Sequence, residues 1–363
     1  MEYSEKLILN SNTKEMLDSL QVNAPDEDIR LQVMKNWDNV AKPIDGMGRF
    51  ETLTAQIGAI QGTDNIDISK KAVIIMCADN GIVEEGISQS GQDVTTAVVK
   101  KMAKGRSSVG KMAAVIGADT IPVDIGINQK ESIQGVVDKK IRLGTRNFKT
   151  EPAMTEEEAV KAIAAGMEMV WICKKKGYKI LATGEMGIGN TTTSSAVAAA
   201  LLDCDVAEVT GRGAGLSDDK LLHKQQVIAE AIAKYELRGA EPFKILQTVG
   251  GLDIAGLAGV CIGGALYRMP IVLDGVISMV AALLADRLVS GVKAYLIPSH
   301  KGKEPAVKKL MEALEVEPVI DGRLALGEGT GAVMMLSLLE MALSVYQDRT
   351  TFSDIQIEQY KRY

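Results

Sequence analysis

Aromatic and metal-binding side chains are scarce in this sequence. Aromatic residues make up only 4% of the 363 residues, so the core must be built from Ala, Val, Ile, Leu and the 17 methionines, which favours helices packed on a sheet. The four cysteines are widely spaced and form no CxxC pair, so buried free thiols are expected rather than disulfides or a zinc site. These cysteines and the two histidines are Cys77, Cys173, Cys204, Cys261, His223 and His300. We therefore expect no bound metal.

The chain also lacks the charge pattern of a nucleic-acid-binding protein. Its formal net charge is −6, and no cluster of Lys and Arg is interleaved with aromatic residues. Residues 1–10 are mixed polar and acidic, without the basic start and apolar core of a signal peptide, so a cytoplasmic protein is expected. The longest apolar stretch, residues 249–267, contains Asp253 and many glycines, which favours a buried helix over a membrane span.

A repeated pattern organises most of the chain: a short β-branched run, a loop rich in Gly, Asp and Ser, and then a helix. The runs cover residues 73–77, 120–125, 179–182, 271–273 and 294–297. Such alternation predicts an α/β fold with a mostly parallel sheet flanked by helices, in which the loops after the strands meet at one edge. The first seventy residues look helical and polar, with a break at 41–49. The charged tail, residues 347–363, either packs as a final helix or extends to a partner.

The most informative segment is residues 326–332 (LGEGTGA), which leads into the apolar run 333–343. Glycines on both sides of Glu328 let the backbone adopt positive φ or approach a ligand closely, and the apolar periodicity that follows predicts a helix. Glu328 is therefore expected to be held in a tight turn. A purely structural Gly-rich turn before a helix is the alternative interpretation of this heptapeptide.

A second glycine-rich segment, residues 183–193 (TGEMGIGNTTT), follows a predicted strand and opens an Ala-rich helix. Three glycines, several hydroxyls and the free N–H groups of a helix N-terminus make a pocket suited to a phosphate. The segment is not a P-loop, because no GK[ST] follows, and its glycine spacing is not that of a dinucleotide fingerprint. A turn required only for packing is the alternative.

Two further segments carry polar groups but no obvious catalytic machinery. After residues 211–215 (GRGAG), Ser217 is expected to cap a helix. Lys224 on this helix could supply positive charge to the same phosphate, or it could simply belong to a solvated face. His223, beside it, is more typical of a surface or interface histidine. Residues 79–95 offer carboxylates, amides and hydroxyls to a polar ligand. Neither segment contains a nucleophile beside a base, so covalent and metal catalysis are not indicated.

Taken together and in order, seven segments resemble the nicotinate-nucleotide:dimethylbenzimidazole phosphoribosyltransferase family over nearly the whole chain. They are Lys42-Pro43 with residues 46–49, the loop 79–95, residues 184–192, 249–251 and 273–275, Ser299-His300 with Glu304-Pro305, and residues 326–332. The segments GEMGIGNTT and LGEGTGA are specific to this family, unlike a lone GxGxxG.

The resemblance implies transfer of 5-phosphoribose from nicotinate mononucleotide to the aromatic lower-ligand base of a cobamide, a step of cobalamin biosynthesis that gives an α-ribotide and nicotinate. It also implies a large α/β domain at residues 71–320 and a small helical lobe built from residues 1–70 and 321–363. A homodimer, or a heterodimer with a paralogue, is expected. No metal or redox cofactor, nucleic acid or membrane is implied.

By motif match, Glu328 takes the general-base position, and Glu185, Gly187 and Lys224 lie around the nucleotide. The pyridinium leaving group departs without a positive charge on its ring nitrogen and needs no acid. The group that the enzyme must supply is therefore a base that removes the proton from the incoming ring nitrogen. Inversion from a β to an α bond fits in-line displacement of an anchored ribose. The full set of expected substrate-binding residues is Glu185, Gly187, Gly189, Asn190, Thr191, Lys224, Asp79, Asn80, Ser88, Ser90, Gln92, Asp274, Gly327 and Gly329.

The chain departs from the family pattern in the predicted base pocket. Asn80 stands where the family commonly has His, and residues 88–91 (SQSG) lack the usual aromatic residue. A further departure concerns the phosphate contact, where Gly302 stands in place of a frequent Ser. A smaller, neutral pocket wall would stack less strongly on a base. Alternatives therefore stay open: a paralogue that accepts phenol or p-cresol together with a similar subunit, or a non-catalytic partner subunit. A dinucleotide-dependent oxidoreductase lacks its fingerprint here.

Overall fold

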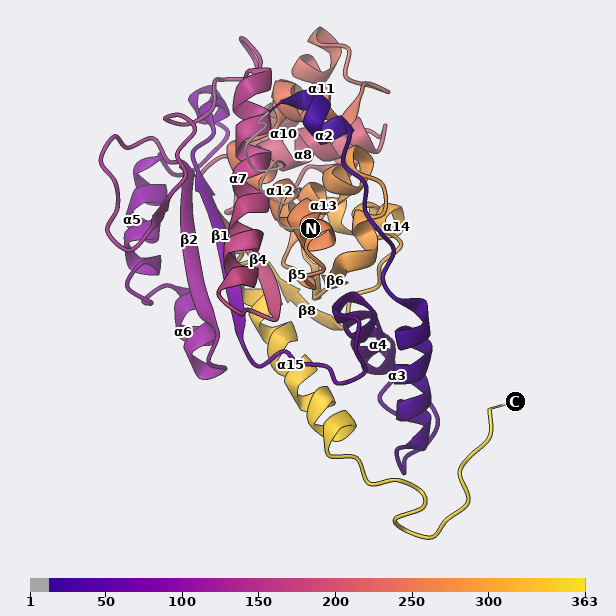
Figure 1. Ribbon diagram of the computed structural model, residues 1–363. Helices are drawn as coiled ribbons and strands as arrows, with labels where there is room; N and C mark the ends of the chain where they lie inside the picture. The colour runs from indigo at the N-terminus through magenta and orange to yellow at the C-terminus, as the bar shows by residue number, and fades with distance from the viewer. Residues whose placement is uncertain (1–12, 363) are drawn as a thin grey trace.

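The protein was analysed as a computed structural model that describes residues 13–362. Its main sheet has six parallel strands in the order β3-β2-β1-β4-β5-β6. The strands are β1 (Lys71–Ala78), β2 (Asp119–Gly126), β3 (Val137–Asp138), β4 (Ile180–Met186), β5 (Ile271–Leu273) and β6 (Leu296–Pro298). Figure 1 shows this sheet between layers of helices, which confirms the predicted α/β class.

Both faces of the sheet are buried, as strand β1 illustrates. All eight residues of β1 are buried, and alternate side chains enter two different hydrophobic clusters. Ile74 and Met76 pack with helices α7 (Glu156–Lys175) and α12 (Leu252–Leu266). Val73 and Ile75 face α15 (Thr330–Gln347), α5 (Asp93–Met102) and α6 (Ser108–Val115). A strand covered on both sides explains the continuous apolar run that the sequence shows at residues 73–77.

The remaining elements connect or extend these layers. A second, two-stranded parallel sheet pairs β7 with β8. The elements are α2 (Lys14–Asp18), α3 (Glu27–Asn39), α4 (Arg49–Gln61), η1 (Gly81–Glu85), α8 (Asn190–Leu201), α9 (Val206–Val209), α10 (Asp218–Lys234), α11 (Pro242–Val249), α13 (Val276–Leu288), η2 (Val292–Tyr295), β7 (His300–Gly302), α14 (Ala306–Leu314) and β8 (Ile320–Leu324).

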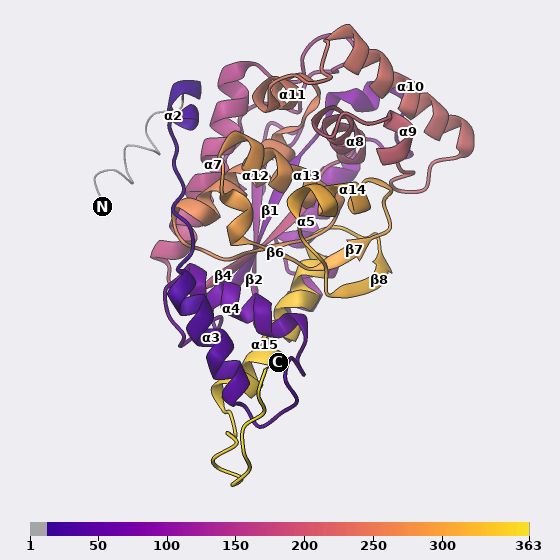
Figure 2. The ribbon, with the colours of Figure 1, turned by 90° about the vertical axis from the view of Figure 1, so that its right-hand side faces the viewer.

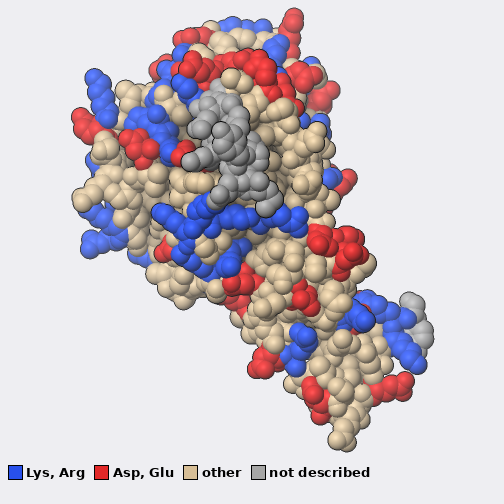
Figure 3. All heavy atoms as spheres, viewed as in Figure 1, with Lys and Arg blue, Asp and Glu red and all other residues tan. Residues whose placement is uncertain are grey.

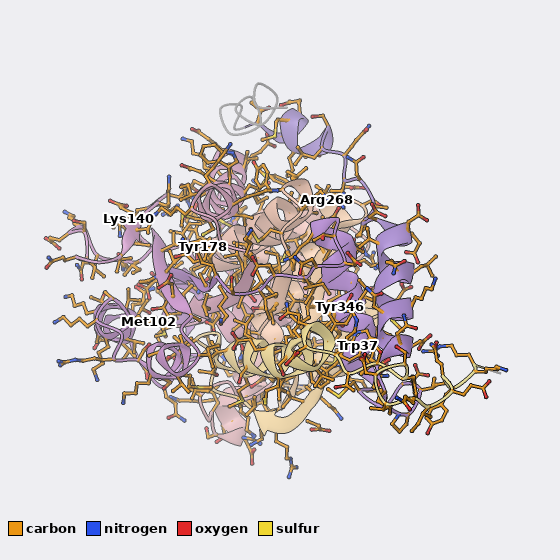
Figure 4. All side chains as sticks on the ribbon, turned by 60° about the horizontal axis from the view of Figure 1, so that its bottom comes forward. Trp37, Met102, Lys140, Tyr178, Arg268 and Tyr346 are labelled. Atoms are coloured by element: carbon orange, nitrogen blue, oxygen red, sulfur yellow. The ribbon has the colours of Figure 1, made fainter. Side chains whose placement is uncertain are left out.

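Segments from the two ends of the described chain lie together beside the sheet. Figures 1 and 2 show α3 and α4 next to the far end of α15 and the tail that follows it. Trp37 is fully buried there; its indole Nε1 donates to Thr54 Oγ1 at 2.8 Å and its ring lies 5.2 Å from that of Tyr346, as Figure 4 illustrates. The small lobe built from both ends, with boundaries at residues 70 and 320, stays a prediction.

The charged tail does not form the final helix that was one of the two expectations. After α15 ends at Gln347, the described residues run as turns and irregular backbone, visible in yellow in Figure 1. Thr351 bridges Val40, and the Arg362 guanidinium donates hydrogen bonds to the carboxylates of Asp38 and Asp45 at 2.6–3.0 Å. Charged and turn-forming residues prevent a buried helical face, so the tail follows the surface of α3 instead.

Other expectations from the sequence are met. Helix α12, with its acidic Asp253, is buried almost throughout, as predicted for the apolar stretch. Helix α15 is long and apolar enough to cross a membrane by length and composition alone, but 56% of that window is buried inside the protein. All four cysteines are free, and three are buried. Figure 3 shows basic side chains gathered in a band across the middle of one face, with acidic side chains mainly above and below it.

Candidate active site

The site lies where the strand order of the main sheet reverses direction, between β1 and β4. In open parallel sheets the loops at such a point diverge to opposite faces and leave a crevice at the carboxyl ends of the strands. A cavity of about 290 Å³ opens beside this point, at the carboxyl ends of β4 and β5, near the lower end of the range for small-molecule pockets. Its wall includes seven of the residues predicted from the sequence: Glu185, Gly187, Asn190, Thr191, Asp274, Gly327 and Glu328.

Glu328 is held in the tight turn that the sequence predicts. Its φ of 63° is left-handed, which is uncommon for a residue with a side chain, and it lies between Gly327 and Gly329 at φ of 82° and 99°. The half-buried carboxylate accepts a hydrogen bond from Val109 N at 3.0 Å, in the first turn of α6. Helix α15 begins at Thr330, immediately after the turn. The carboxylate therefore has a defined direction rather than a free choice of rotamers.

Asp274 is the anchor of this turn. Its buried carboxylate accepts hydrogen bonds from the backbone amides of Gly329 at 3.1 Å, Gly331 at 2.9 Å and Ala332 at 3.2 Å. These amides belong to the N-terminus of α15, where N–H groups have no intrahelical partner, so Asp274 caps the helix from outside. Asp274 was predicted to bind substrate; it lies in the cavity wall, but its oxygens are engaged with the backbone.

His300 packs against the same helix start. A side chain at Gly331 would overlap its imidazole ring, and its Nδ1 lies 2.8 Å from Ser299 Oγ. Burial lowers the pKa of His300 and raises the pKa of Asp274, while the two groups attract each other and partly oppose those shifts. Only a glycine at position 331 allows the ring to approach the helix this closely. The ring thus fixes where α15 begins.

Glu185 lies on strand β4, which corrects the expectation that residues 183–187 form a loop. Met76 of β1 pairs with Glu185, and Cys77 pairs with Met186, so the strand continues to the cavity. Burial raises the pKa of Glu185 to about 8, and the nearby carboxylates of Asp253 and Asp274 add to the shift. Asn190 donates a hydrogen bond to Glu185 through Nδ2. At neutral pH this carboxyl is predominantly protonated and can itself donate a hydrogen bond.

The predicted anion pocket is formed at the start of α8. Gly189 precedes the helix with φ of 94°, which only glycine adopts without strain, and Gly187 packs so closely on the Ala78 carbonyl that no side chain would fit. Lys224 Nζ donates to Thr191 Oγ1 at 2.9 Å and to the Gly211 carbonyl at 3.2 Å. Hydroxyls and helix amides therefore lie at one end of the cavity, with an ammonium group directly behind Thr191.

Lys224 is buried, with 1% of its surface exposed, so the solvated-face alternative is wrong. Burial lowers its pKa to about 8, and the carboxylate of Glu304 opposes this shift. The ammonium lies behind Thr191 rather than in the cavity wall. His223, its neighbour on α10, directs Nε2 to the Glu85 carbonyl at 2.8 Å, which agrees with a surface or interface role.

The loop after β1 divides into scaffold residues and residues at the cavity. Asp79 is internal: it accepts hydrogen bonds from Thr95 Oγ1 at 2.6 Å and from Asn128 N at 2.8 Å. Gln92 bridges Asn128 Nδ2 at 2.7 Å and the Asn80 carbonyl at 3.3 Å. Asp79 and Gln92 were predicted to bind substrate, but in the structure they hold loops together, because their polar atoms are engaged by neighbouring backbone and side chains.

Ser88 lines a smaller adjoining cavity of about 80 Å³ together with Gly189 and Asn190. The amide of Ser90 donates to Ser88 Oγ at 3.2 Å, so Ser90 supports this wall. Asn80 is fully buried, and its Nδ2 donates to the Ile188 carbonyl at 3.4 Å, joining the loops after β1 and β4. The two cavities share Gly187, Asn190 and Thr191, among others, as wall residues, which makes them neighbouring compartments of one site.

Three contributors were missed at the sequence level. Val109 offers only a backbone amide, Glu304 follows the β7 strand, and Asp253 sits in an apolar helix where burial raises its pKa to about 6. Two of them carried a signal in the sequence: Glu304 belongs to a segment that resembles the family, and Asp253 is a lone carboxylate in an apolar stretch. Neither was assigned a role from the sequence. Among residues 13–362 no cluster of three or more His, Cys, Asp or Glu side chains could hold a metal ion.

Comparisons with known proteins agree on one family. A family model described as phosphoribosyltransferase matches residues 22–357. The nicotinate-nucleotide–dimethylbenzimidazole phosphoribosyltransferase of Acetivibrio thermocellus is 45% identical over 329 residues, covering 91% of this chain and 94% of that protein. The protein of the same name from Clostridium acetobutylicum is 43% identical over 340 residues, covering 94% and 97%. The crystal structure of CobT from Thermus thermophilus superimposes with a TM-score of 0.87 at 34% identity, covering 92% of this chain and all of that one.

Proposed function

Because this chain belongs to the nicotinate-nucleotide–dimethylbenzimidazole phosphoribosyltransferase family, we propose that it transfers 5-phosphoribose from nicotinate mononucleotide to 5,6-dimethylbenzimidazole or a related base. The products are an α-ribotide and nicotinate. The observation that carries this assignment is a single cavity with an anion pocket at α8 and the Glu328 turn in the same wall. The relatives described above are named for dimethylbenzimidazole and give no support to the phenolic alternative.

The phosphate of the nucleotide binds at the start of α8. Amides around Gly189 and the hydroxyl of Thr191 face the phosphate, and Lys224 supplies positive charge through Thr191. Fixing the phosphate fixes the ribose, so that C1′ presents one face to the acceptor. Protonated Glu185, which is buried beside Asn190, donates a hydrogen bond to the bound nucleotide. A neutral group at this position avoids repulsion of the anionic substrate.

Glu328 acts as the general base. The incoming ring nitrogen carries a proton that must leave as the bond to C1′ forms, and nicotinate departs from a pyridinium without needing an acid. The hydrogen bond from Val109 N orients the carboxylate before the base arrives. Its negative charge also stabilises the positive charge that develops on the sugar and the acceptor. Attack from the face opposite the leaving group inverts the anomeric centre.

The acceptor binds beside Ser88 and Ser90, near the smaller cavity. This wall lacks an aromatic platform, so stacking on the base is expected to be weaker by about 0.5–1.5 kcal/mol than on an aromatic wall. We therefore expect use of unsubstituted benzimidazole alongside the dimethyl compound, and a shift toward the bulkier base in Ser90→Tyr. We also propose a cytoplasmic location and a dimer.

The test is an assay of nicotinate release with a panel of benzimidazoles, purines and phenols, with the product linkage read by NMR. Glu328→Gln should keep the fold, because the amide is nearly isosteric, and lower turnover by about 10²-fold or more. Glu358→Gln, an exposed glutamate in the tail, serves as the matched control and should leave turnover unchanged. Undiminished turnover in Glu328→Gln would remove this residue from the mechanism.

A further inference from the structure

Glu304 occupies an unexplained place at the phosphate end of the cavity. It lies in the cavity wall between β7 and α14, in the same wall as Thr191 and Gly213. Its carboxylate packs against Gly211, where even a methyl group would overlap it. Gly211 is also the residue whose carbonyl accepts a hydrogen bond from Lys224 at 3.2 Å. A carboxylate therefore lies close to the ammonium group that the proposed phosphate site uses.

The charges around this carboxylate are unbalanced. In residues 13–362, no Lys, Arg or His nitrogen lies within 4.0 Å of the Glu304 carboxylate, and no carboxylate lies within that distance of Lys224 Nζ. The two groups nevertheless influence each other: Lys224 and Lys303 lower the pKa of Glu304, although its burial has the larger effect and raises that pKa. Lys224 uses two of its three N–H donors, on Thr191 Oγ1 and the Gly211 carbonyl, and one stays available.

We propose that Glu304 is a resident counter-anion for Lys224, which the phosphate group of the nucleotide displaces when it binds. In the free enzyme the carboxylate offsets part of the positive charge of the buried ammonium from beyond hydrogen-bond distance, so no hydrogen bond between them has to be broken. A phosphate brings up to two negative charges to the same ammonium, so the carboxylate must turn away or take up a proton. This inference rests on the proposed function, because it assigns the anion pocket to a phosphate.

This competition predicts an effect on phosphate-containing ligands that ligands without a phosphate do not show. A ligand with a phosphate monoester can replace the charge of Glu304, whereas a riboside without phosphate cannot and meets the carboxylate unchanged. Glu304 thus raises the KM for the mononucleotide and has no comparable effect on the chemical step. Its contribution is the opposite of an ordinary binding residue, since removing its charge should strengthen binding of phosphate-containing ligands.

The experiment compares the full-length protein with Glu304→Gln and Glu304→Ala. Glu312→Gln, on the exposed side of α14, is the matched control. Steady-state assays give kcat and KM for nicotinate mononucleotide, and calorimetry gives the Kd for ribose 5-phosphate and for nicotinate riboside. Both Glu304 variants should lower the KM and the Kd for ribose 5-phosphate by roughly threefold or more, with kcat and the riboside Kd within about twofold.

Each outcome decides between the alternatives. A higher KM in Glu304→Gln would mean that the carboxylate supports phosphate binding by keeping Lys224 charged, and an unchanged KM would mean that it does not sense the phosphate; both overturn the proposal. Equal changes for ribose 5-phosphate and the riboside would also overturn it. Suppose that neither the parent protein nor the Glu304 variants turn over the nucleotide, but that the variants bind ribose 5-phosphate with the expected lower Kd. The proposed function then fails and the counter-anion role stands. No binding of ribose 5-phosphate to any variant overturns the role.

Discussion

At the residue scale, two buried carboxyl groups have raised pKa values that make the stability of the protein depend on pH. Burial raises the pKa of Glu185 to about 8 and that of Asp253 to about 6, whereas such groups in an unfolded chain titrate near 4. The folded state therefore keeps protons that the unfolded state releases as the pH rises above about 4. It follows that the free energy of unfolding falls with rising pH between about 5 and 8 because of these groups.

Replacing Glu185 by Gln removes its part of this pH dependence. The amide cannot ionise, so the free energy of unfolding of Glu185→Gln minus that of the parent protein should rise from pH 5 to pH 8, by at most about 1.4 kcal/mol per pH unit. Denaturant unfolding at pH 5, 6.5 and 8 measures it. Glu230→Gln, on the exposed face of α10, should show no such trend. A constant difference at all three values would mean that Glu185 is ionised in the folded protein.

The charge of Lys224 also depends on pH, and its loss affects substrate binding. Burial lowers its pKa to about 8, so the ammonium loses its charge as the pH rises above that value, and the KM for nicotinate mononucleotide should rise with it. Lys224→Arg should remove this rise, because a guanidinium stays charged. Lys220→Ala, an exposed lysine of the same helix, should retain the behaviour of the parent protein. Initial rates from pH 7 to 9.5 provide the measurement, and a flat KM in the parent protein would contradict it.

At the scale of secondary structure, the first turn of α15 is positioned by a residue outside the helix. Asp274 accepts hydrogen bonds from the backbone amides of Gly329, Gly331 and Ala332. These residues follow Glu328 in the chain. Asp274→Asn replaces one accepting oxygen by a donor, which leaves at least one of these buried amides without a partner. We expect a loss of about 1–3 kcal/mol in the free energy of unfolding and reduced turnover at unchanged nucleotide KM.

Thermal unfolding and steady-state kinetics measure the two effects of Asp274→Asn. Asp219→Asn, in the exposed first turn of α10, is the control and should change neither quantity markedly. If Asp274→Asn loses stability but keeps full turnover, the capping interaction is structural only and Glu328 is positioned by other contacts. If the nucleotide KM changes most, Asp274 touches the substrate, as the sequence first suggested.

The elements themselves were largely predictable, and the exceptions have physical causes. Apolar β-branched runs predicted β1, β2 and β5 to within two residues, because a strand buried on both faces must be apolar throughout. Strand β4 was predicted too short, since Gly184 and Glu185 have low strand propensity and only pairing with β1 keeps them extended. For the tail, the sequence did not decide between a helix and an extended segment, because its charged residues fit either.

The site was predictable where backbone chemistry is special and much less so elsewhere. Glycines at positions 189, 327 and 329 marked the turns that the structure contains, since glycine adopts left-handed backbone without strain. The burial of Lys224 and the anchoring role of Asp274 could not be read from local sequence, because both depend on segments far away in the chain. Asp79 looked like a ligand for the same reason: its partners Thr95 and Asn128 come together only in the fold.

At the scale of the whole molecule, α15 carries an exposed apolar face. Met334, Met341 and Val345 follow one another at helical spacing and are 38%, 56% and 38% exposed. Such a face favours burial against a second copy, so we predict a dimer in solution. Met341→Glu should shift the protein toward monomer, whereas Met341→Leu should not. Sedimentation equilibrium measures the change, and a fully active monomer of the parent protein would refute the prediction.

The arrangement of α15 across the sheet also governs the order of events during synthesis. Val333, Leu336 and Leu339 cover the face of β1 that contains Val73 and Ile75, although more than 250 residues separate them in the chain. While a ribosome is still translating, that face has no cover, and the nascent sheet exposes apolar surface of the kind that recruits chaperones. Glu328 emerges just ahead of the helix that completes the core. An unfinished chain therefore lacks both the proposed general base and the helix that covers this face of β1.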